Sequence, residues 1–144
     1  MDTLTPKERS ERMRRVRGKN TAPEMIVRRL VHGLGYRFRL HDRRLPGRPD
    51  LVFAGRRKVI FVHGCFWHRH RRCRLATTPK TNVEFWTTKF QENVSRDSTI
   101  RRQLRAAGWN SLVIWQCELH NPEVLVERIR TFLEDEKTQS KSQY

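Results

Sequence analysis

Three residues whose side chains bind cations or move protons lie at or shortly after the ends of two short apolar runs. Asp50 precedes Leu51–Phe53, His63 ends the run that begins at Val59, and His68 follows five residues later. Carboxylate oxygens bind Mg²⁺, and an imidazole of near-neutral pKa exchanges protons with water. Together they provide what phosphodiester hydrolysis needs. Alternatively, Asp50 is a turn residue after a proline, and the histidines belong to a polar surface loop.

Thiol and imidazole side chains in the same region have the spacing of a metal site. Cys65, His70 and Cys73 lie within nine residues, and Cys117 follows much later in the chain. Structural zinc prefers four such ligands in a tetrahedron. We therefore expect a closed zinc site, with no catalytic role, that attaches a polar loop to the rest of the fold. Alternatively, the cysteines are reduced and packed as small apolar residues, or the histidines of this stretch share one metal.

Aromatic residues lie beside the same polar residues. Phe66 and Trp67 are adjacent, and Trp86 follows in the next expected element. Because adjacent side chains rarely point into one core, at least one of Phe66 and Trp67 should be exposed, where it can stack on nucleic-acid bases. The alternative is that one packs on the cysteine-containing loop and the other on a sheet. Trp86 is compatible with either a packing or a stacking role.

The charge composition favours a polyanionic partner. The chain has 31 Lys and Arg residues against 15 Asp and Glu residues, a formal net charge of +16. These positive charges repel one another unless a polyanion neutralises them, which favours nucleic acid. The 144 residues suit one domain with its own core. No apolar stretch approaches the roughly 20 residues of a membrane span. The N-terminus does not resemble a signal peptide, and the odd number of cysteines, three, does not favour the disulfides of a secreted protein.

The N-terminal part is expected to form two helices. Residues 3–17 are basic and begin with a capping-box pattern, but they contain few apolar residues. We therefore expect residues 1–20 to be a DNA-binding arm that orders on its partner. Thr21 can cap the second helix, which has a proline and Glu24 in its first turn.

The remaining pattern predicts an α/β fold. Alternating or continuous apolar runs predict strands, and apolar residues at helical spacing predict helices. The expected elements are strands at Tyr36–Leu40, Leu51–Phe53, Val59–Val62 and Leu112–Trp115, and helices at Glu84–Ala107 and Pro122–Glu136. This order suggests a mixed sheet with helices on both faces. Residues 21–136 would form one domain, residues 63–82 its zinc-stapled loop, and residues 137–144 a disordered tail.

Several motifs together resemble one known family. They are Arg12–Arg14, Asn20–Glu24, Leu45–Asp50, Phe61–His68, Glu84–Trp86, Asn93–Asp97 and Trp115–Cys117. On these residues the chain resembles the very-short-patch repair (Vsr) endonucleases, a branch of the PD-(D/E)xK restriction-endonuclease-like superfamily. The resemblance implies a restriction-endonuclease-like mixed β-sheet flanked by helices. It also implies a Mg²⁺-dependent nick 5′ to the thymine of a T·G mismatch, which arises when 5-methylcytosine deaminates.

The resemblance assigns catalytic roles to individual residues. Asp50 would be the principal Mg²⁺ ligand, and the backbone carbonyl of Val62 the other protein ligand. His68 would act as general base on the attacking water, and His63 would assist near the scissile phosphate. Glu24 would support the hydrated metal through its water molecules.

The resemblance also implies a structural metal and a set of DNA contacts. Structural Zn²⁺ would be bound by Cys65, His70, Cys73 and Cys117. The side chains expected to contact DNA are Phe66, Trp67 and Trp86 as major-groove wedges, Met13 from the minor groove, and Lys89 and Asn93. Asn93 is in addition a candidate for supporting the hydrated metal.

The chain departs from the family pattern at a few positions. The (D/E)xK element is absent, because the corresponding strand reads Phe61-Val62-His63, so a histidine takes over the base chemistry. Val62 stands where the best-known members carry Thr, and it therefore has only a backbone role. Gln116 replaces a Glu found in many relatives, and the spacing from His70 to Cys73 is one residue longer than in some.

The resemblance implies partners as well as a reaction. The substrate would be double-stranded DNA with a T·G mismatch, and a cytosine-5 DNA methyltransferase and general mismatch-repair proteins would be functionally linked. The enzyme would be a monomer without membrane association, cytoplasmic in a bacterium and nucleoid-associated when acting. One alternative is a restriction- or transposon-type nuclease of the superfamily that acts on unmismatched DNA. Another is a non-enzymatic zinc DNA-binding module, for which Asp50, His63 and His68 are dispensable.

Overall fold

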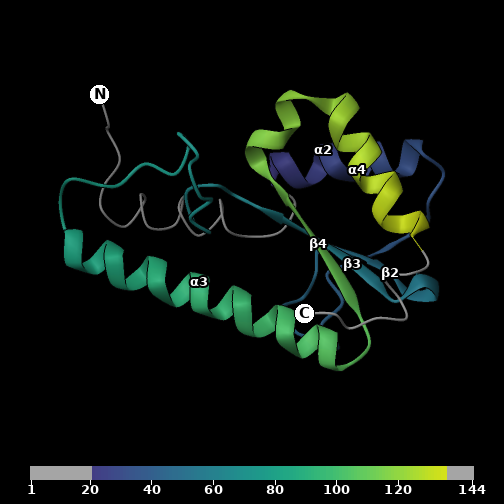
Figure 1. Cartoon of the computed structure of the whole chain (residues 1–144), viewed down its shortest axis with the longest axis horizontal. Coiled ribbons are helices and arrows are strands. Elements are labelled where there is room, and N and C mark those ends of the chain that lie inside the picture. Colours follow the sequence, from purple (N-terminus) through teal and green to yellow (C-terminus); the bar gives the residue numbers. More distant parts are fainter. Residues whose placement is uncertain (1–20, 136–144) are drawn as a thin grey trace.

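A mixed sheet of four strands forms the centre of the protein in a computed structural model that describes residues 21–135 (Figure 1). In order across the sheet the strands are β1 (Arg39–Leu40), β2 (Leu51–Phe53), β3 (Lys58–His63) and β4 (Asn110–Trp115). β2 pairs antiparallel with β1 and β3, whereas β4 lies parallel to β3. The helix expected over residues 3–17, with Met13, and the tail expected at 137–144 lie outside the described residues.

Helices cover both faces of the sheet, as expected. On one face lie α2 (Ala22–Gly33) and α4 (Pro122–Glu134), and α3 (Val83–Ala106) lies on the other (Figure 1). The first core contains Val27, Val31, Leu51, Phe53, Ile60, Ile114, Leu125, Ile129 and Leu133. The second contains Val52, Val59, Phe61 and Leu104. Neighbouring residues of β2 and β3 alternate between the two cores, because strand side chains alternate in direction.

One end of the sheet collects the residues suited to chemistry. β2 and β3 form the expected hairpin, in which Leu51 pairs with Ile60, so β2 begins close to where β3 ends. β4 runs parallel to β3 and pairs its last residue, Trp115, with His63. Asp50, immediately before β2, therefore lies at the same end of the sheet as His63 and the end of β4.

The first turn of α2 is closed by the expected cap. The Oγ1 of Thr21 accepts a hydrogen bond from the backbone N–H of Glu24 at 3.4 Å, which satisfies one of the amide groups that a helix start leaves without a partner. Glu24 itself is buried. The cap thus fixes the start of α2 and, with it, the position of a buried carboxylate.

A buried lysine ties α4 to the opposite end of the sheet. Lys58, the first residue of β3, is fully buried, and its Nζ donates to the carbonyl oxygens of Phe132 at 2.5 Å, Leu133 at 3.3 Å and Asp135 at 2.7 Å. The last carbonyls of a helix have no partner within the helix, and a cation there is favoured by the helix dipole. Lys58 therefore serves the fold and lies away from Asp50.

α3 is much longer than the strands it covers. Its 24 residues span roughly 36 Å, and its first half extends past the sheet beside the chain that follows β3 (Figure 1). Its buried residues are Phe90, Asn93 and Leu104. Leu104 belongs to the sheet core, whereas Phe90 and Asn93 contact residues of the loop between β3 and α3. The first half of α3 is therefore a support for that loop.

Some expected elements differ from the observed ones. The strand expected at Tyr36–Leu40 contains only its last two residues, because β1 pairs with only two residues of the short strand β2. α4 ends two residues before the expected end, at Glu134, and α3 is shifted by one residue. An unexpected 3₁₀ helix, η2 (Gln116–His120), follows β4 and carries Cys117. Among residues 21–135, no helix is long and apolar enough to cross a membrane.

Candidate active site and metal centres

Asp50 directs its carboxylate at the backbone of the neighbouring strand. Its Oδ2 accepts a hydrogen bond from the backbone N–H of Val62 at 2.6 Å. Burial raises the pKa of Asp50 to about 7 and the nearby carboxylate of Glu24 adds to this, although the Val62 N–H acts in the opposite direction. A bound cation would favour the ionised form of such a carboxyl group. Asp50 is therefore placed where a cation and a carboxylate stabilise each other.

The side chains of Glu24 and His41 both lie close to Asp50. This position was expected for Glu24 but not for His41. Glu24 accepts a hydrogen bond from Arg28, and its Oε2 lies 2.8 Å from the Nε2 of His41. The same His41 nitrogen lies 3.8 Å from Oδ1 of Asp50. One potential ligand atom from each of Glu24, His41 and Asp50 lies within 4.8 Å of the others. Because two of the three are carboxylates, the residues present fit the Mg²⁺ expected there.

His63 and His68 form a second group at this end of the sheet. Their rings stack with centroids 3.8 Å apart and planes 7° from parallel. The Nδ1 of His68 lies 2.6 Å from Oδ2 of Asp97, which comes from α3. A carboxylate held there orients the ring and favours the proton on Nδ1, which leaves Nε2 as the nitrogen for proton transfer. The arrangement therefore suits His68 to the role of a general base.

His63 is much less accessible than His68. It is 6% exposed, and its ring meets that of Trp115 edge-on at 5.3 Å. Burial, reinforced by the neighbouring His68, lowers the pKa of His63 to about 3. Within residues 21–135 no group forms a hydrogen bond with its buried Nδ1. His63 is thus a neutral imidazole at neutral pH, able to offer a hydrogen bond but not a positive charge.

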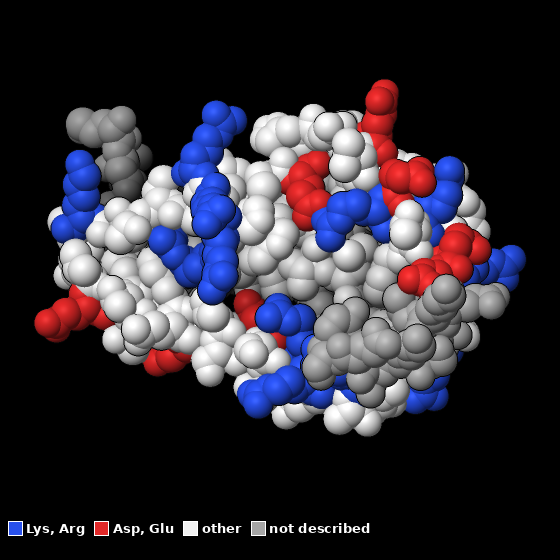
Figure 2. Space-filling view, viewed as in Figure 1, with Lys and Arg blue, Asp and Glu red and all other residues white. Residues whose placement is uncertain are grey.

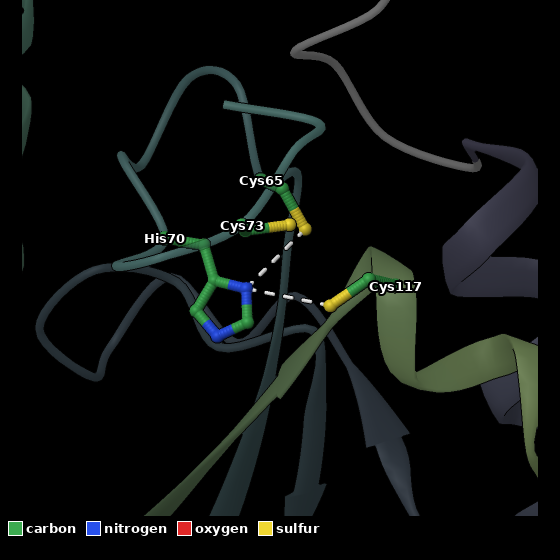
Figure 3. A group of neighbouring side chains, drawn as sticks. All are labelled: Cys65, His70, Cys73 and Cys117. Carbon is green, nitrogen blue, oxygen red and sulfur yellow. Dashed lines mark hydrogen bonds between the residues drawn. The ribbon is translucent and has the colours of Figure 1, made fainter. Parts of the chain in front are cut away.

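The four side chains expected to bind zinc lie together, as Figure 3 shows. The Nδ1 of His70 is 3.7 Å from the Sγ of Cys65 and 3.3 Å from the Sγ of Cys117. A tetrahedral zinc ion with ordinary bond lengths separates such nitrogen and sulfur ligands by about 3.6 Å. The Cys73 sulfur completes the group, so the donor types and their spacing fit Zn²⁺.

Local contacts hold this group in position. The His70 ring stacks on Trp115, with centroids 4.2 Å apart, and the backbone N–H of His70 donates to the carbonyl of Cys65 at 3.1 Å. Burial raises the pKa of the Cys65 thiol to about 12. A thiol in this setting ionises when a metal ion compensates for its burial. The alternative in which His63, His68 and His70 share a metal is not what the structure shows, since His70 joins the cysteines.

The aromatic residues form one cluster on α3. Phe66 meets Trp67, Trp86 and Phe90 edge-on at centroid distances of 5.2, 5.8 and 5.3 Å. Trp67 is buried and Phe66 is partly buried. The expectation that one of this adjacent pair is exposed is wrong, because both rings pack against α3 rather than on opposite sides of the loop. Among residues 21–135, the exposed aromatic residue is Phe85, at 61%.

Asn93 and Lys89 occupy different positions on α3. Asn93 is buried, and its Nδ2 donates to the backbone carbonyl of Trp67 at 3.2 Å. Its amide thus links the loop to α3. Asn93 was expected to contact DNA, and this structural role was not evident from the sequence. Lys89 is partly buried and lines a shallow hollow with Phe85 and Glu92. Of the two, Lys89 is the residue placed at the surface.

Basic side chains cover the loop between β3 and α3. Figure 2 shows a column of Lys and Arg side chains over this region, left of the centre of the view. The loop contributes Arg69, Arg71, Arg72, Arg74 and Lys80. Arg69 is held in place, since its guanidinium donates to the carbonyl oxygens of Phe66, Ala76 and Thr77. Because Arg69 lies over the rings of Phe66 and Phe90, this basic loop adjoins the aromatic cluster.

Comparison with known proteins is consistent with these features. Residues 1–74 match the family model described as DNA mismatch endonuclease Vsr. The type II nicking enzyme V.XorIIP of Xanthomonas oryzae pv. oryzae is 49% identical over 92% of this chain and 97% of its own length. The DNA mismatch endonuclease Vsr of Escherichia coli K12 is 43% identical over 85% of this chain and 78% of its own. The chain belongs to the Vsr family of DNA endonucleases.

The structure of this Vsr-family protein adds residues that sequence reasoning missed. His41 meets Asp50 and Glu24, Asp97 holds His68, and Phe85 is the exposed aromatic. A signal for Asp97 was present, because Asn93 and Asp97 are four residues apart on one helix and therefore share a face. No comparable pattern marks His41, whose position depends on the fold of the loop after β1.

Proposed function

We propose that this Vsr-family protein is a Mg²⁺-dependent endonuclease that nicks one strand of double-stranded DNA 5′ to the thymine of a T·G mismatch. The observation that carries the proposal is the meeting of two groups at one end of the sheet. Asp50 with Glu24 suits a cation, and His68 held by Asp97 suits a general base. Hydrolysis of a phosphodiester needs both. The names of the matched family and of the E. coli relative support the mismatch as substrate.

The fold is consistent with this assignment. A mixed four-stranded sheet between helices agrees with the restriction-endonuclease-like architecture that we propose for it. The start of β2 and the end of β3 bring Asp50 and Val62 together through a direct hydrogen bond. The hairpin therefore positions the two residues proposed as protein ligands of Mg²⁺, the Asp50 carboxylate and the Val62 carbonyl.

The protein holds the cation-binding groups before DNA arrives. Asp50 is fixed by the Val62 N–H, and Glu24 is fixed by Arg28 and His41. When bound, Mg²⁺ neutralises charge that develops on the phosphate and lowers the pKa of a coordinated water. Glu24, in our proposal, accepts hydrogen bonds from water in the metal's hydration shell. Fixed groups of this kind lose little freedom at the moment of reaction.

His68 is the proposed general base. Asp97 accepts a hydrogen bond from its Nδ1, so its Nε2 is free to accept the proton of the attacking water. His63 stacks on His68 and is kept neutral by its low pKa. A neutral neighbour does not oppose the positive charge that His68 acquires. His63, whose buried Nδ1 has no hydrogen-bond partner among residues 21–135, is proposed to assist near the scissile phosphate.

Zn²⁺ is proposed to have a structural role. Its four ligands would be Cys65, His70, Cys73 and Cys117, which join the loop after β3 to η2. His68 lies inside the segment that these ligands enclose, directly after Phe66 and Trp67. The zinc site would therefore position the general base and the aromatic cluster together, without contacting the substrate.

DNA is proposed to bind over the basic loop and the aromatic cluster. The arginines of the loop would neutralise phosphates, with Lys89 as a further contact. Phe66, Trp67 and Trp86 would act as wedges beside the mismatch. Because these rings now contact one another and Phe90, entry into a base stack would exchange protein contacts for stacking on bases. A cytosine-5 DNA methyltransferase would create the methylated base from which the mismatch arises.

The proposal is tested by incubating the zinc-loaded protein and Mg²⁺ with end-labelled duplexes that differ only in one T·G or T·A pair. Since the flanking sequence is unknown, the pair is placed in a library of randomised flanks. We expect a single nick 5′ to the mismatched thymine, and no cutting by Asp50→Ala. Equal cutting of the T·A duplex, or double-strand breaks in it, would instead identify a restriction-type nuclease.

A further inference from the structure

His41 stands between the two carboxylates of the proposed cation site. Its Nε2 lies 2.8 Å from Oε2 of Glu24 and 3.8 Å from Oδ1 of Asp50. These distances bracket the roughly 3 Å that separate neighbouring ligands of an octahedral divalent cation. The same ring nitrogen therefore faces both carboxylates at ligand spacing, and an ion bound to Asp50 can also contact His41 after small movements.

The fold presents His41 to this position in a defined way. The residue follows β1 directly and has a φ of 48°, in the left-handed region, which histidine tolerates better than most residues. Its side chain is only 12% exposed. A polar side chain that is mostly shielded from solvent and sits on an uncommon backbone conformation is typical of functional positions. The ring is thus built into the site and is not a surface group that reaches it by chance.

The charges at the site leave a place for a cation. Glu24 and Asp50 bring two carboxylates close together, and Arg28 forms an ion pair with Glu24. The Nε2 of His41 already lies at hydrogen-bond distance from the Oε2 of Glu24. A divalent cation can take the place of that hydrogen bond, because an imidazole nitrogen without a hydrogen is a metal ligand.

We propose that His41 is a direct nitrogen ligand of the catalytic cation. The site proposed to use Mg²⁺ is then a mixed nitrogen and oxygen site that also binds first-row divalent transition ions, and binds them more tightly than Mg²⁺. This inference rests on the proposed function, in that it concerns the cation at Asp50. An all-oxygen site suits Mg²⁺, whereas imidazole nitrogen strengthens binding of transition ions. Mn²⁺ is the appropriate probe, because it also tolerates oxygen ligands and competes poorly with zinc for thiolates.

The test is electron spin echo envelope modulation of Mn²⁺ bound to the full-length, zinc-loaded protein. We expect the modulation of a directly coordinated nitrogen in the wild type. It should vanish in His41→Gln, which can still donate a hydrogen bond to Glu24. It should persist in His32→Gln, which alters an exposed histidine of α2, and in His68→Gln. By equilibrium titration, His41→Gln should weaken Mn²⁺ binding by about tenfold or more and Mg²⁺ binding by less than about threefold.

The outcomes separate this inference from the proposed function. If Mn²⁺ binds in an Asp50-dependent manner without nitrogen modulation, or if the modulation survives in His41→Gln, the role of His41 is refuted while the cation site stands. If Asp50→Asn leaves Mn²⁺ binding unchanged, the cation site itself is wrong, and the inference is overturned with it. Thermal unfolding of His41→Gln and of a second variant, His41→Asn, verifies that lost modulation does not reflect unfolding.

Discussion

Replacing the partly buried carboxylate of Asp50 with an amide should abolish cutting and, at the same time, stabilise the protein without Mg²⁺. Burial raises the pKa of Asp50 from 3.8 to about 7. Each pKa unit corresponds to 1.36 kcal/mol, so the ionised group destabilises the fold by up to about 4 kcal/mol. Asparagine keeps an oxygen that accepts from the Val62 N–H. We expect Asp50→Asn to raise the free energy of unfolding by about 2–4 kcal/mol at pH 8.

The pH dependence of this difference follows from its sign. Because the pKa of Asp50 is higher in the folded protein, folding favours the protonated form, and the destabilisation appears only as pH rises above 3.8 and is complete above about 7. The advantage of Asp50→Asn over the wild type should therefore fall to roughly half of its pH 8 value at pH 5.5. Urea unfolding of both proteins at the two pH values, without added Mg²⁺, measures it.

A control and a metal titration make this prediction specific. Asp42 has its pKa held below the ordinary value by its hydrogen bonds from Arg44, so Asp42→Asn should not stabilise the protein at pH 8. Mg²⁺ should stabilise the wild type and leave Asp50→Asn unchanged, because a ligand stabilises only the fold that binds it. If Asp50→Asn is no more stable than the wild type at pH 8, or if its advantage does not vary with pH, the account of Asp50 is wrong.

Other predictions concern the base, the zinc site and the fold. Asp97→Asn should slow single-turnover cutting by about 100-fold or more, because an amide orients His68 less well; a rate within about threefold of the wild type would contradict this. Cys117→Ala should reduce bound zinc and the unfolding temperature, and an unchanged zinc content by elemental analysis would refute the ligand set. Lys58→Met should lower the free energy of unfolding by about 2–4 kcal/mol, because the last carbonyls of α4 lose a buried donor, and unchanged urea unfolding would disprove that role.

Helices and strands that are determined by a local sequence pattern, such as a cap or a run of apolar residues, were predictable from the sequence. The Thr21 cap, the hairpin of β2 and β3, and the long helix α3 are confirmed. The strand expected from Tyr36 onward is mostly absent, because its length depends on a partner strand that has only three residues. Alternating apolar and polar side chains predict that a segment can form a strand. Whether it does so depends on the backbone partners that the tertiary fold provides.

The candidate site was predictable where its residues flank paired strands. Asp50 and His63 meet because β2 and β3 form a hairpin, and the four cysteine and histidine side chains lie together as expected; zinc itself stays a prediction. His41 and Asp97 depend on how a loop folds and on which face of α3 meets the loop after β3. Those features arise from packing between segments far apart in the sequence.

Single-turnover cutting rates measure whether the cation and base at the end of the sheet nick DNA only at a mismatch. Two duplexes of identical sequence, one with T·G and one with T·A, are compared at saturating Mg²⁺, with each strand labelled in turn. We expect cleavage of only the thymine strand, 5′ to that base, at least about 100-fold faster on the T·G duplex and absent with Asp50→Asn. Equal rates on both duplexes, or cutting that survives in Asp50→Asn, would contradict it.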